Sequence, residues 1–160
     1  MKRNLAIKLA WAFSAAFAIA TLMGFIPNPL VGQNALFVTN TAHNLVHLAT
    51  AIGFAVVAII GNRASTRFML AFGAVYTLVG FLGFAMLGGA TETHLLGIIH
   101  INFLDNFLHV GLGVAIAAGG WVAFRKEQQD AKGLKGYDPV AYFTDSRPTR
   151  GNASLSLIHI

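Results

Sequence analysis

Residues 42–60 read AHNLVHLATAIGFAVVAII, and this stretch decides the fold of the chain. It contains no charged residue, and it lies within a longer uncharged region that runs from Lys8 to Arg63. A helix rises 1.5 Å per residue, so a stretch of this length crosses the hydrocarbon core of a bilayer, which is about 30 Å thick. The sequence therefore predicts a helix that spans a membrane.

The composition extends this prediction to the whole chain. Of its 160 residues, 56% are hydrophobic and only 11% are charged. Soluble domains carry about a quarter charged residues, so most of this surface must face lipid. Four stretches are long and apolar enough to span a bilayer: 5–26, 42–60, 68–87 and 101–124. We expect an all-α fold, an integral membrane four-helix bundle whose main partner is the lipid bilayer.

Basic residues orient the four spans. They precede the first span, separate the second from the third, and follow the fourth: Lys2, Arg3, Lys8, Arg63, Arg67, Arg125 and Lys126. The other two loops, 27–41 and 88–100, contain no lysine or arginine. The positive-inside rule then predicts a multi-pass protein of the bacterial inner membrane with both termini in the cytoplasm. The net charge of +5 reflects this topology, and we expect no nucleic-acid partner.

The first span has a rival interpretation as a cleaved signal peptide. It has a basic start, an apolar stretch and small residues at Ala16, Ala18 and Ala20. Cleavage would delete half of one unit of an internal repeat, which argues against this interpretation.

The repeat is visible at the starts of the second and fourth spans. Residues 40–47 read NTAHNLVH, and residues 102–109 read NFLDNFLH. The preceding spans end alike, in LMGF at 22–25 and FLGF at 81–84. The sequence therefore predicts two repeated helical hairpins of the same orientation, related by a pseudo-two-fold axis along the membrane normal. We assign a helix-packing role to the small residues along the spans, namely Gly53, Gly73, Gly80, Gly83, Gly111 and Gly113.

Each repeated segment places a polar stripe on one helix face, because its polar positions are spaced i, i+3, i+4 and i+7. The two stripes consist of Asn40, His43, Asn44 and His47, and of Asn102, Asp105, Asn106 and His109. Counting from the cytoplasmic helix ends puts His47 and His109 at one depth, about 8–10 Å below the outer surface of the hydrocarbon core. Polar groups exposed to lipid are unfavourable, so we expect the stripes to face each other inside the bundle.

Four interpretations of this polar cluster remain open. The first is structural, with side chains that bond across the helix pair. The second is a metal site whose ligands are His43, His47, Asp105 and His109, a set suited to zinc, iron or manganese. The third is haem held between His47 and His109. The fourth is movement of protons or small solutes through Asp105 and the histidines.

Sequence motifs exclude several chemistries. The chain has no cysteine, so it has no disulfide and no thiolate ligand. It also lacks a phosphate-binding loop, a dinucleotide fingerprint and a nucleophile elbow. The sequence favours a small non-enzymatic membrane protein, structural or accessory to other membrane subunits, with a metal- or haem-binding protein and a conductor as alternatives.

Three segments carry a family resemblance: HNLVHLAT at 43–50, VYTLVGFLGF at 75–84 and NFLDNFLHVGLG at 102–113. Over residues 5–124 the chain resembles the four-helix bacterial membrane family known as domain of unknown function 4383. The resemblance implies four spans and no known activity.

Composition changes abruptly after the fourth span, which predicts a transmembrane domain at 1–126 and a polar cytoplasmic tail at 127–160. Residues 133–151, GLKGYDPVAYFTDSRPTRG, resemble the opening of a YHS-type domain, a small module sometimes associated with metals. Only its first part is present, so the resemblance implies no binding residue here. The final LSLIHI resembles a translated sequencing adapter, from which we expect a truncated reading frame.

Overall fold

The computed structural model describes residues 5–135, and the elements follow one another along that range. They are α1 (Leu5–Phe25), β1 (Val31–Gly32), β2 (Phe37–Val38), α2 (Thr41–Ile60), α3 (Asn62–Leu87), β3 (Glu92–Leu95), β4 (Ile99–Asn102) and α4 (Phe103–Lys135). The chain divides into two compact units, Met1–Lys126 and Glu127–Ile160. The first unit is mostly helical, and the described part of the second continues the helix α4 to Lys135.

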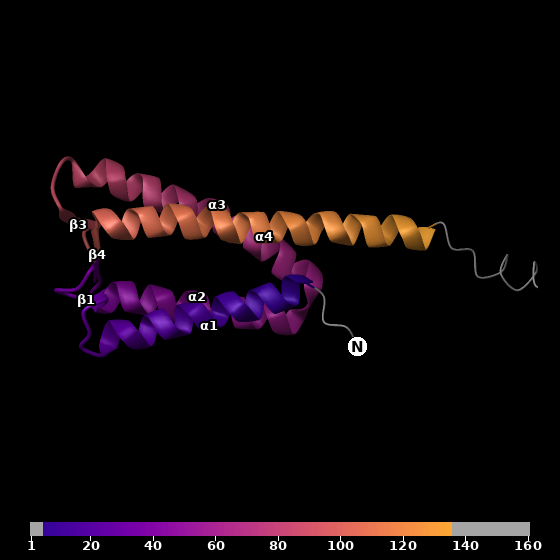
Figure 1. Cartoon of the computed structure of the whole chain (residues 1–160), viewed down its shortest axis with the longest axis horizontal. Helices are drawn as coiled ribbons and strands as arrows, with labels where there is room; N and C mark the ends of the chain where they lie inside the picture. Colours follow the sequence, from indigo (N-terminus) through magenta and orange to yellow (C-terminus); the bar gives the residue numbers. More distant parts are fainter. Residues whose placement is uncertain (1–4, 136–160) are drawn as a thin grey trace, which may run out of the picture. The chain divides into compact units, whose positions relative to one another are not determined.

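The helices of the first unit pack in pairs, α1 with α2 and α3 with α4 (Figure 1). In the first pair, Ser14 Oγ donates a hydrogen bond of 2.8 Å to the carbonyl oxygen of Ala51. In the second pair the backbones approach closely, and a Cβ atom added at Gly73 would lie 2.5 Å from the nitrogen of Ala117. Glycine therefore permits the second pair to form, as packing in lipid requires.

An aromatic core joins the first pair to α3. Phe17 of α1 stacks on Phe54 of α2 with ring centroids 5.9 Å apart, and meets Tyr76 of α3 edge-on at 5.6 Å. Phe54 is fully buried and also contacts Phe68 and Phe72 of α3. These rings bury large apolar surfaces with favourable edge-to-face geometry, so they fix how the pairs meet.

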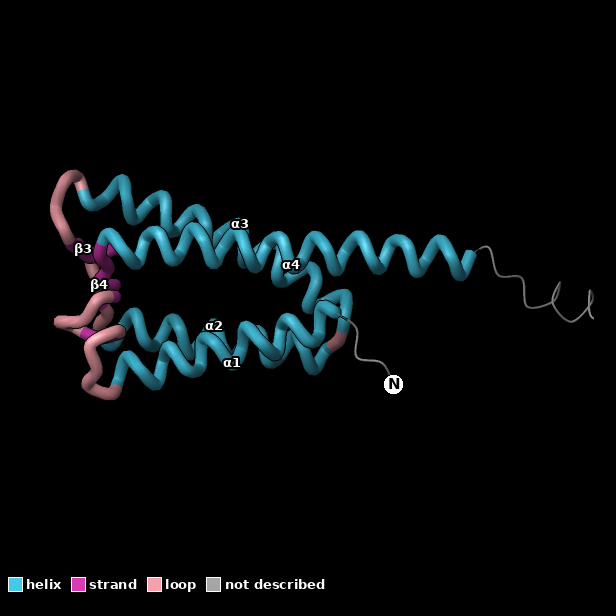
Figure 2. Tube along the Cα trace, viewed as in Figure 1, coloured by secondary structure: helices cyan, strands magenta, loops and turns pink. Residues whose placement is uncertain are grey.

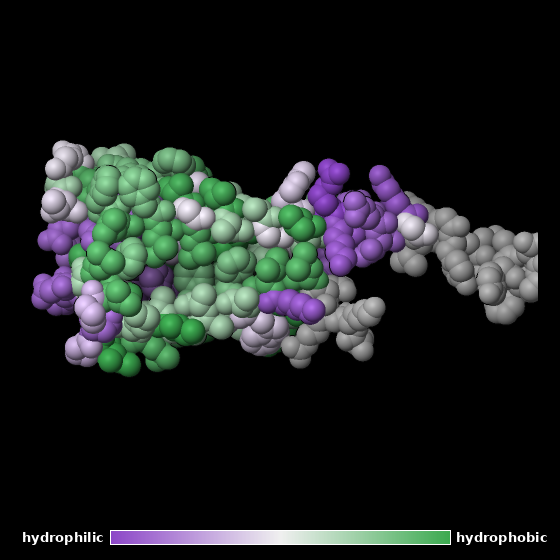
Figure 3. Space-filling view, viewed as in Figure 1, coloured by the Kyte–Doolittle hydropathy of each residue, from purple (hydrophilic) through white to green (hydrophobic). Residues whose placement is uncertain are grey.

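The outer surface of the helices is apolar. All four helices are long and apolar enough to cross a membrane, and only 28–39% of each apolar window is buried inside the protein. Large hydrophobic side chains point outward, including Ile59 at 74% exposure and Leu78 at 65%. Figure 3 shows a broad hydrophobic band between hydrophilic ends. A surface of this kind implies contact with the lipid bilayer.

The two loops between helices of a pair contain short strands, which the all-α prediction missed. β1 and β2 pair in parallel, and β3 and β4 form an antiparallel hairpin in which His94 faces His100. Both loops lie at one end of the first unit, opposite the connection between α2 and α3 (Figure 2). Strands this short carry little periodicity, so the sequence offers no signal for them.

One predicted boundary was wrong. α3 begins at Asn62 rather than at residue 68, so Arg63 and Arg67 lie on its first two turns and not in a loop. Gly61 alone separates α2 from α3, with a φ of 132° that favours glycine. We also expected residues 126–130 to continue the fourth helix beyond the span, and α4 does continue past residue 124, to Lys135.

Candidate metal centre

The polar stripes begin at the caps of α2 and α4. Asn40 is the N-cap of α2, and its Oδ1 accepts a hydrogen bond of 3.0 Å from the backbone nitrogen of His43. Asn102 does the same for α4, since its Oδ1 accepts from the nitrogen of Asp105 at 2.9 Å. The Asp105 carboxylate accepts in return from the nitrogen of Asn102 at 3.0 Å, which completes a reciprocal capping box.

Each capping asparagine also donates a hydrogen bond to a loop of the other helix pair. Asn40 Nδ2 donates to the carbonyl oxygen of Ile98, and Asn102 Nδ2 donates to that of Leu36, each at 2.8 Å. Each cap therefore holds the loop of the opposite helix pair. This arrangement fixes the starts of α2 and α4 next to each other.

Replacing either capping asparagine with alanine is expected to destabilise the protein by a similar amount. Asn40→Ala and Asn102→Ala each remove a cap and an interloop hydrogen bond, together worth about 1–3 kcal/mol. Thermal unfolding in detergent measures the loss. Asn34→Ala, at an exposed loop position, is the control. An equal effect of all three variants would show that the exchanged bonds contribute nothing.

The second asparagine of each stripe closes its helix pair. Asn44 Nδ2 donates to the carbonyl oxygen of Gly24 at 2.8 Å, and a Cβ atom at Gly24 would overlap the Asn44 side chain. Asn106 lies in the same way against Gly83. All four asparagines predicted for the polar cluster thus serve helix ends and helix pairing.

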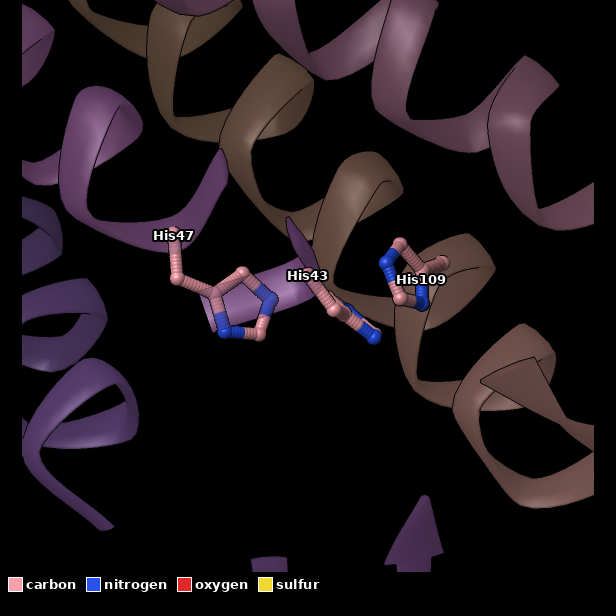
Figure 4. Close-up of side chains that lie close together, drawn as sticks. All are labelled: His43, His47 and His109. Carbon is pink, nitrogen blue, oxygen red and sulfur yellow. The ribbon is translucent and has the colours of Figure 1, made fainter. Parts of the chain in front are cut away.

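The three histidines of the stripes lie close together near the stranded loops, two on α2 and one on α4 (Figure 4). His43, His47 and His109 are buried, and one ring nitrogen from each lies within 4.8 Å of the others. The ring centroids of His43 and His47 are 4.6 Å apart, and those of His43 and His109 are 5.6 Å apart. The structure therefore brings together three of the four side chains predicted as metal ligands.

Hydrogen bonds orient two of these rings. His43 Nδ1 lies 2.8 Å from the carbonyl oxygen of His100, and His109 Nδ1 lies 2.6 Å from that of Asp105. A carbonyl oxygen can only accept, so in both rings Nδ1 carries the proton and donates it. In the neutral imidazole the Nε2 atom then keeps its lone pair.

Two ring nitrogens in the cluster lack a hydrogen-bond partner. Among the described residues, none bonds His43 Nε2 or His47 Nδ1, although both atoms are buried. Leaving a buried polar atom unpaired costs about 1–3 kcal/mol, which natural proteins rarely accept without a reason. A histidine that binds a metal usually donates the N–H of one ring nitrogen to a backbone carbonyl or a carboxylate. The other ring nitrogen then binds the metal with its lone pair.

Asp105 does not join this group. Its carboxylate is buried at the start of α4 and bonds to the backbone of Asn102, as described above. It still lines a cavity of about 90 Å³ next to the histidines. Asp105 therefore acts on the cluster by capping the helix that carries His109.

Sequence reasoning missed two neighbours of the histidines. The ring of Tyr76 lies 4.5 Å from that of His109, and the ring of Phe17 lies 5.7 Å from that of His47. The predicted repeat offers one signal for them, because the register that matches Gly24 with Gly83 would also match Phe17 with Tyr76.

Comparisons with known proteins identify part of the chain. Residues 66–129, which cover most of α3 and α4, match the family described as Domain of unknown function (DUF4383). No curated protein and no solved structure matches the chain. The YHS-type resemblance at residues 133–151 receives no support, and most of that segment lies outside the described residues. The identity that the comparisons establish is therefore a DUF4383 domain at residues 66–129, next to a first helix pair for which the resemblance stays a prediction.

Proposed function

We propose that this chain is a multi-pass membrane protein that binds one transition-metal ion through His43, His47 and His109. The convergence of three buried imidazoles from two helices carries the proposal. Nδ1 of His43 and of His109 is held by a backbone carbonyl, so Nε2 is the free ligand atom in both. A ring nitrogen of His47 supplies the third lone pair, and its Nδ1 has no hydrogen-bond partner among the described residues.

Neutral imidazole suits zinc, iron, copper and nickel better than magnesium or calcium, which prefer oxygen. Nitrogens bound to one zinc ion at about 2.0–2.1 Å lie about 3.4 Å apart. One ring nitrogen from each histidine lies within 4.8 Å of the others, so ring rotations that move the nitrogens by about 1 Å complete the site. Three protein ligands leave a fourth position open, as in catalytic rather than structural zinc sites.

A metal ion fits the cluster better than haem does. Sites for cofactors and drug-sized ligands occupy about 300–1,000 Å³, whereas the cavity beside His47 and His109 measures about 90 Å³. The ring of His43 also lies close to both other rings and would occupy the space of a porphyrin between them.

The proposal includes a topology and an evolutionary origin. We place both termini in the cytoplasm, because Lys8, Arg63 and Arg67 lie at the ends of helices opposite the stranded loops. We also propose that the two helix pairs arose by duplication. The exchanged bonds of Asn40 and Asn102 and the matched positions of Asn44 and Asn106 support that origin.

Metal titration of the intact protein tests the function. Protein purified in detergent is stripped with a chelator and titrated with Co²⁺ and with Zn²⁺ in the presence of a competing indicator. We expect one ion per chain and visible absorption bands of four- or five-coordinate Co²⁺. A structural or accessory role alone predicts no saturable binding, and that result would refute the proposal.

A further inference from the structure

A small cavity leads from the histidine cluster toward the lipid-facing surface. It measures about 90 Å³, and its inner end is lined by His47, His109, Tyr76 and Asp105. Its walls come from α1, α4 and the β1–β2 loop, with Ala16, Ala20, Phe37 and Leu112 among the lining residues. Figure 3 shows a hollow near the stranded loops, with hydrophilic residues at its base.

The mouth of the cavity opens among residues that face lipid. Leu108 is 47% exposed and Ala16 is also exposed, although both line the cavity. Apart from Thr39 and the polar side chains beside the histidines, the lining is aliphatic or aromatic, so a charged molecule would lose most of its hydration there without compensation. The cavity therefore favours uncharged molecules that dissolve in the bilayer.

Its volume limits the size of the occupant. An engineered protein cavity of about 150 Å³ accepts benzene, and a water molecule occupies about 30 Å³ in the liquid. A cavity of about 90 Å³ thus accepts a molecule of two to four heavy atoms but no aromatic ring. Diatomic gases such as dioxygen and nitric oxide meet both the size and the polarity requirement.

We propose that this cavity delivers a small uncharged ligand, of the size of a diatomic gas, from the bilayer to the open position of the metal ion. The proposal rests on the proposed function, because the metal at His43, His47 and His109 supplies the bond. The bound ligand donates a lone pair to the metal and displaces a water molecule, and no atom is transferred. The Tyr76 ring, 4.5 Å from that of His109, borders the position where the ligand would lie.

Nitric oxide is the probe, because its complex with a high-spin Fe²⁺ ion has a distinctive electron paramagnetic resonance signal. The full chain in lipid nanodiscs is loaded with Fe²⁺ without oxygen and titrated with nitric oxide. We expect the signal of an iron–nitrosyl complex at one spin per bound iron. If the protein binds iron and the signal does not form, the proposed metal site stands and the ligand site is refuted. If it binds no metal ion, both are refuted.

Cavity-filling variants test the route. Ala20→Phe obstructs the cavity from its α1 wall and changes none of the three histidines, so we expect retained iron and loss of the nitrosyl signal. Ala15→Phe adds the same ring to α1 at an exposed position that does not line the cavity, and we expect the wild-type signal. If Ala20→Phe fails to bind iron, Leu112→Phe tests the same route by obstructing the cavity from its α4 wall. A wild-type signal in a cavity variant that retains iron would overturn the route through this cavity.

Discussion

Replacing His43 with alanine is expected to lower the zinc affinity of the protein by at least about 100-fold, since even changes behind a metal ligand cost 10- to 100-fold. His47→Ala and His109→Ala are expected to lose as much, because each removes one of three ligands. The measurement is competitive zinc titration of the detergent-purified variants. His94→Ala is the matched control, because His94 is an exposed histidine of the β3–β4 hairpin and lies outside the cluster.

The stability of the metal-free variants separates a binding role from a structural one. His43 Nε2 and His47 Nδ1 are buried, and no described residue bonds them. Replacing His47 with phenylalanine removes an unpaired polar atom and keeps a ring next to Phe17, so apo stability should be retained or increased. Zinc should then no longer raise the unfolding temperature of this variant, as it raises that of the wild type. A large loss of apo stability with unchanged zinc affinity would assign the histidines a purely structural role.

Much of this fold can be derived from the sequence, because lipid imposes a simple rule. Each uncharged stretch had to become a helix that satisfies its own backbone, so the four helices and their order follow directly. The i, i+3, i+4, i+7 spacing of the stripes also placed His43, His47 and His109 on inward faces. That inference needed only the cost of exposing polar groups to hydrocarbon.

The roles of individual polar residues did not follow from that rule. Asp105 has a ligand's chemistry and a ligand's position along the helix, and yet its carboxylate bonds to the backbone of Asn102. A capping box and a metal site use the same residue types, so only the three-dimensional course of the loop decides between them. The partners of Asn40 and His43 are backbone carbonyls of Ile98 and His100, which no side-chain pattern reveals.

The packing role of the glycines could also be predicted only in part, because the sequence does not show which helix face each glycine lies on. All six glycines assigned to packing lie in helices, but a Cβ atom at Gly111 would meet nothing within 4 Å. That assignment was wrong for Gly111, because small residues occur on lipid-facing surfaces as well as at interfaces. At Gly73 and Gly113, by contrast, the opposing backbone is in contact.

This contrast predicts that Gly73→Leu destabilises the protein by about 2–3 kcal/mol or more, as overpacking of a tight interface does. An added Cβ would lie 2.5 Å from the nitrogen of Ala117 and 2.7 Å from the carbonyl oxygen of Gly113. Both atoms belong to the backbone of α4 and cannot rotate away, so α3 and α4 must separate. Close packing drives helix association in lipid, where no hydrophobic effect operates between helices, and the separation therefore removes the main force that holds the pair together.

The matched variant is Gly111→Leu, which adds the same side chain to the exposed face of α4. It should leave stability unchanged or raise it slightly, because glycine inside a helix costs about 0.5–1 kcal/mol relative to alanine. Thermal unfolding in detergent compares the two, and zinc affinity reports whether His109 stays in register with the histidines of α2. Equal stabilities of the two variants would mean that α3 and α4 do not approach at Gly73. The close packing of α3 against α4, on which the position of His109 depends, would then be refuted.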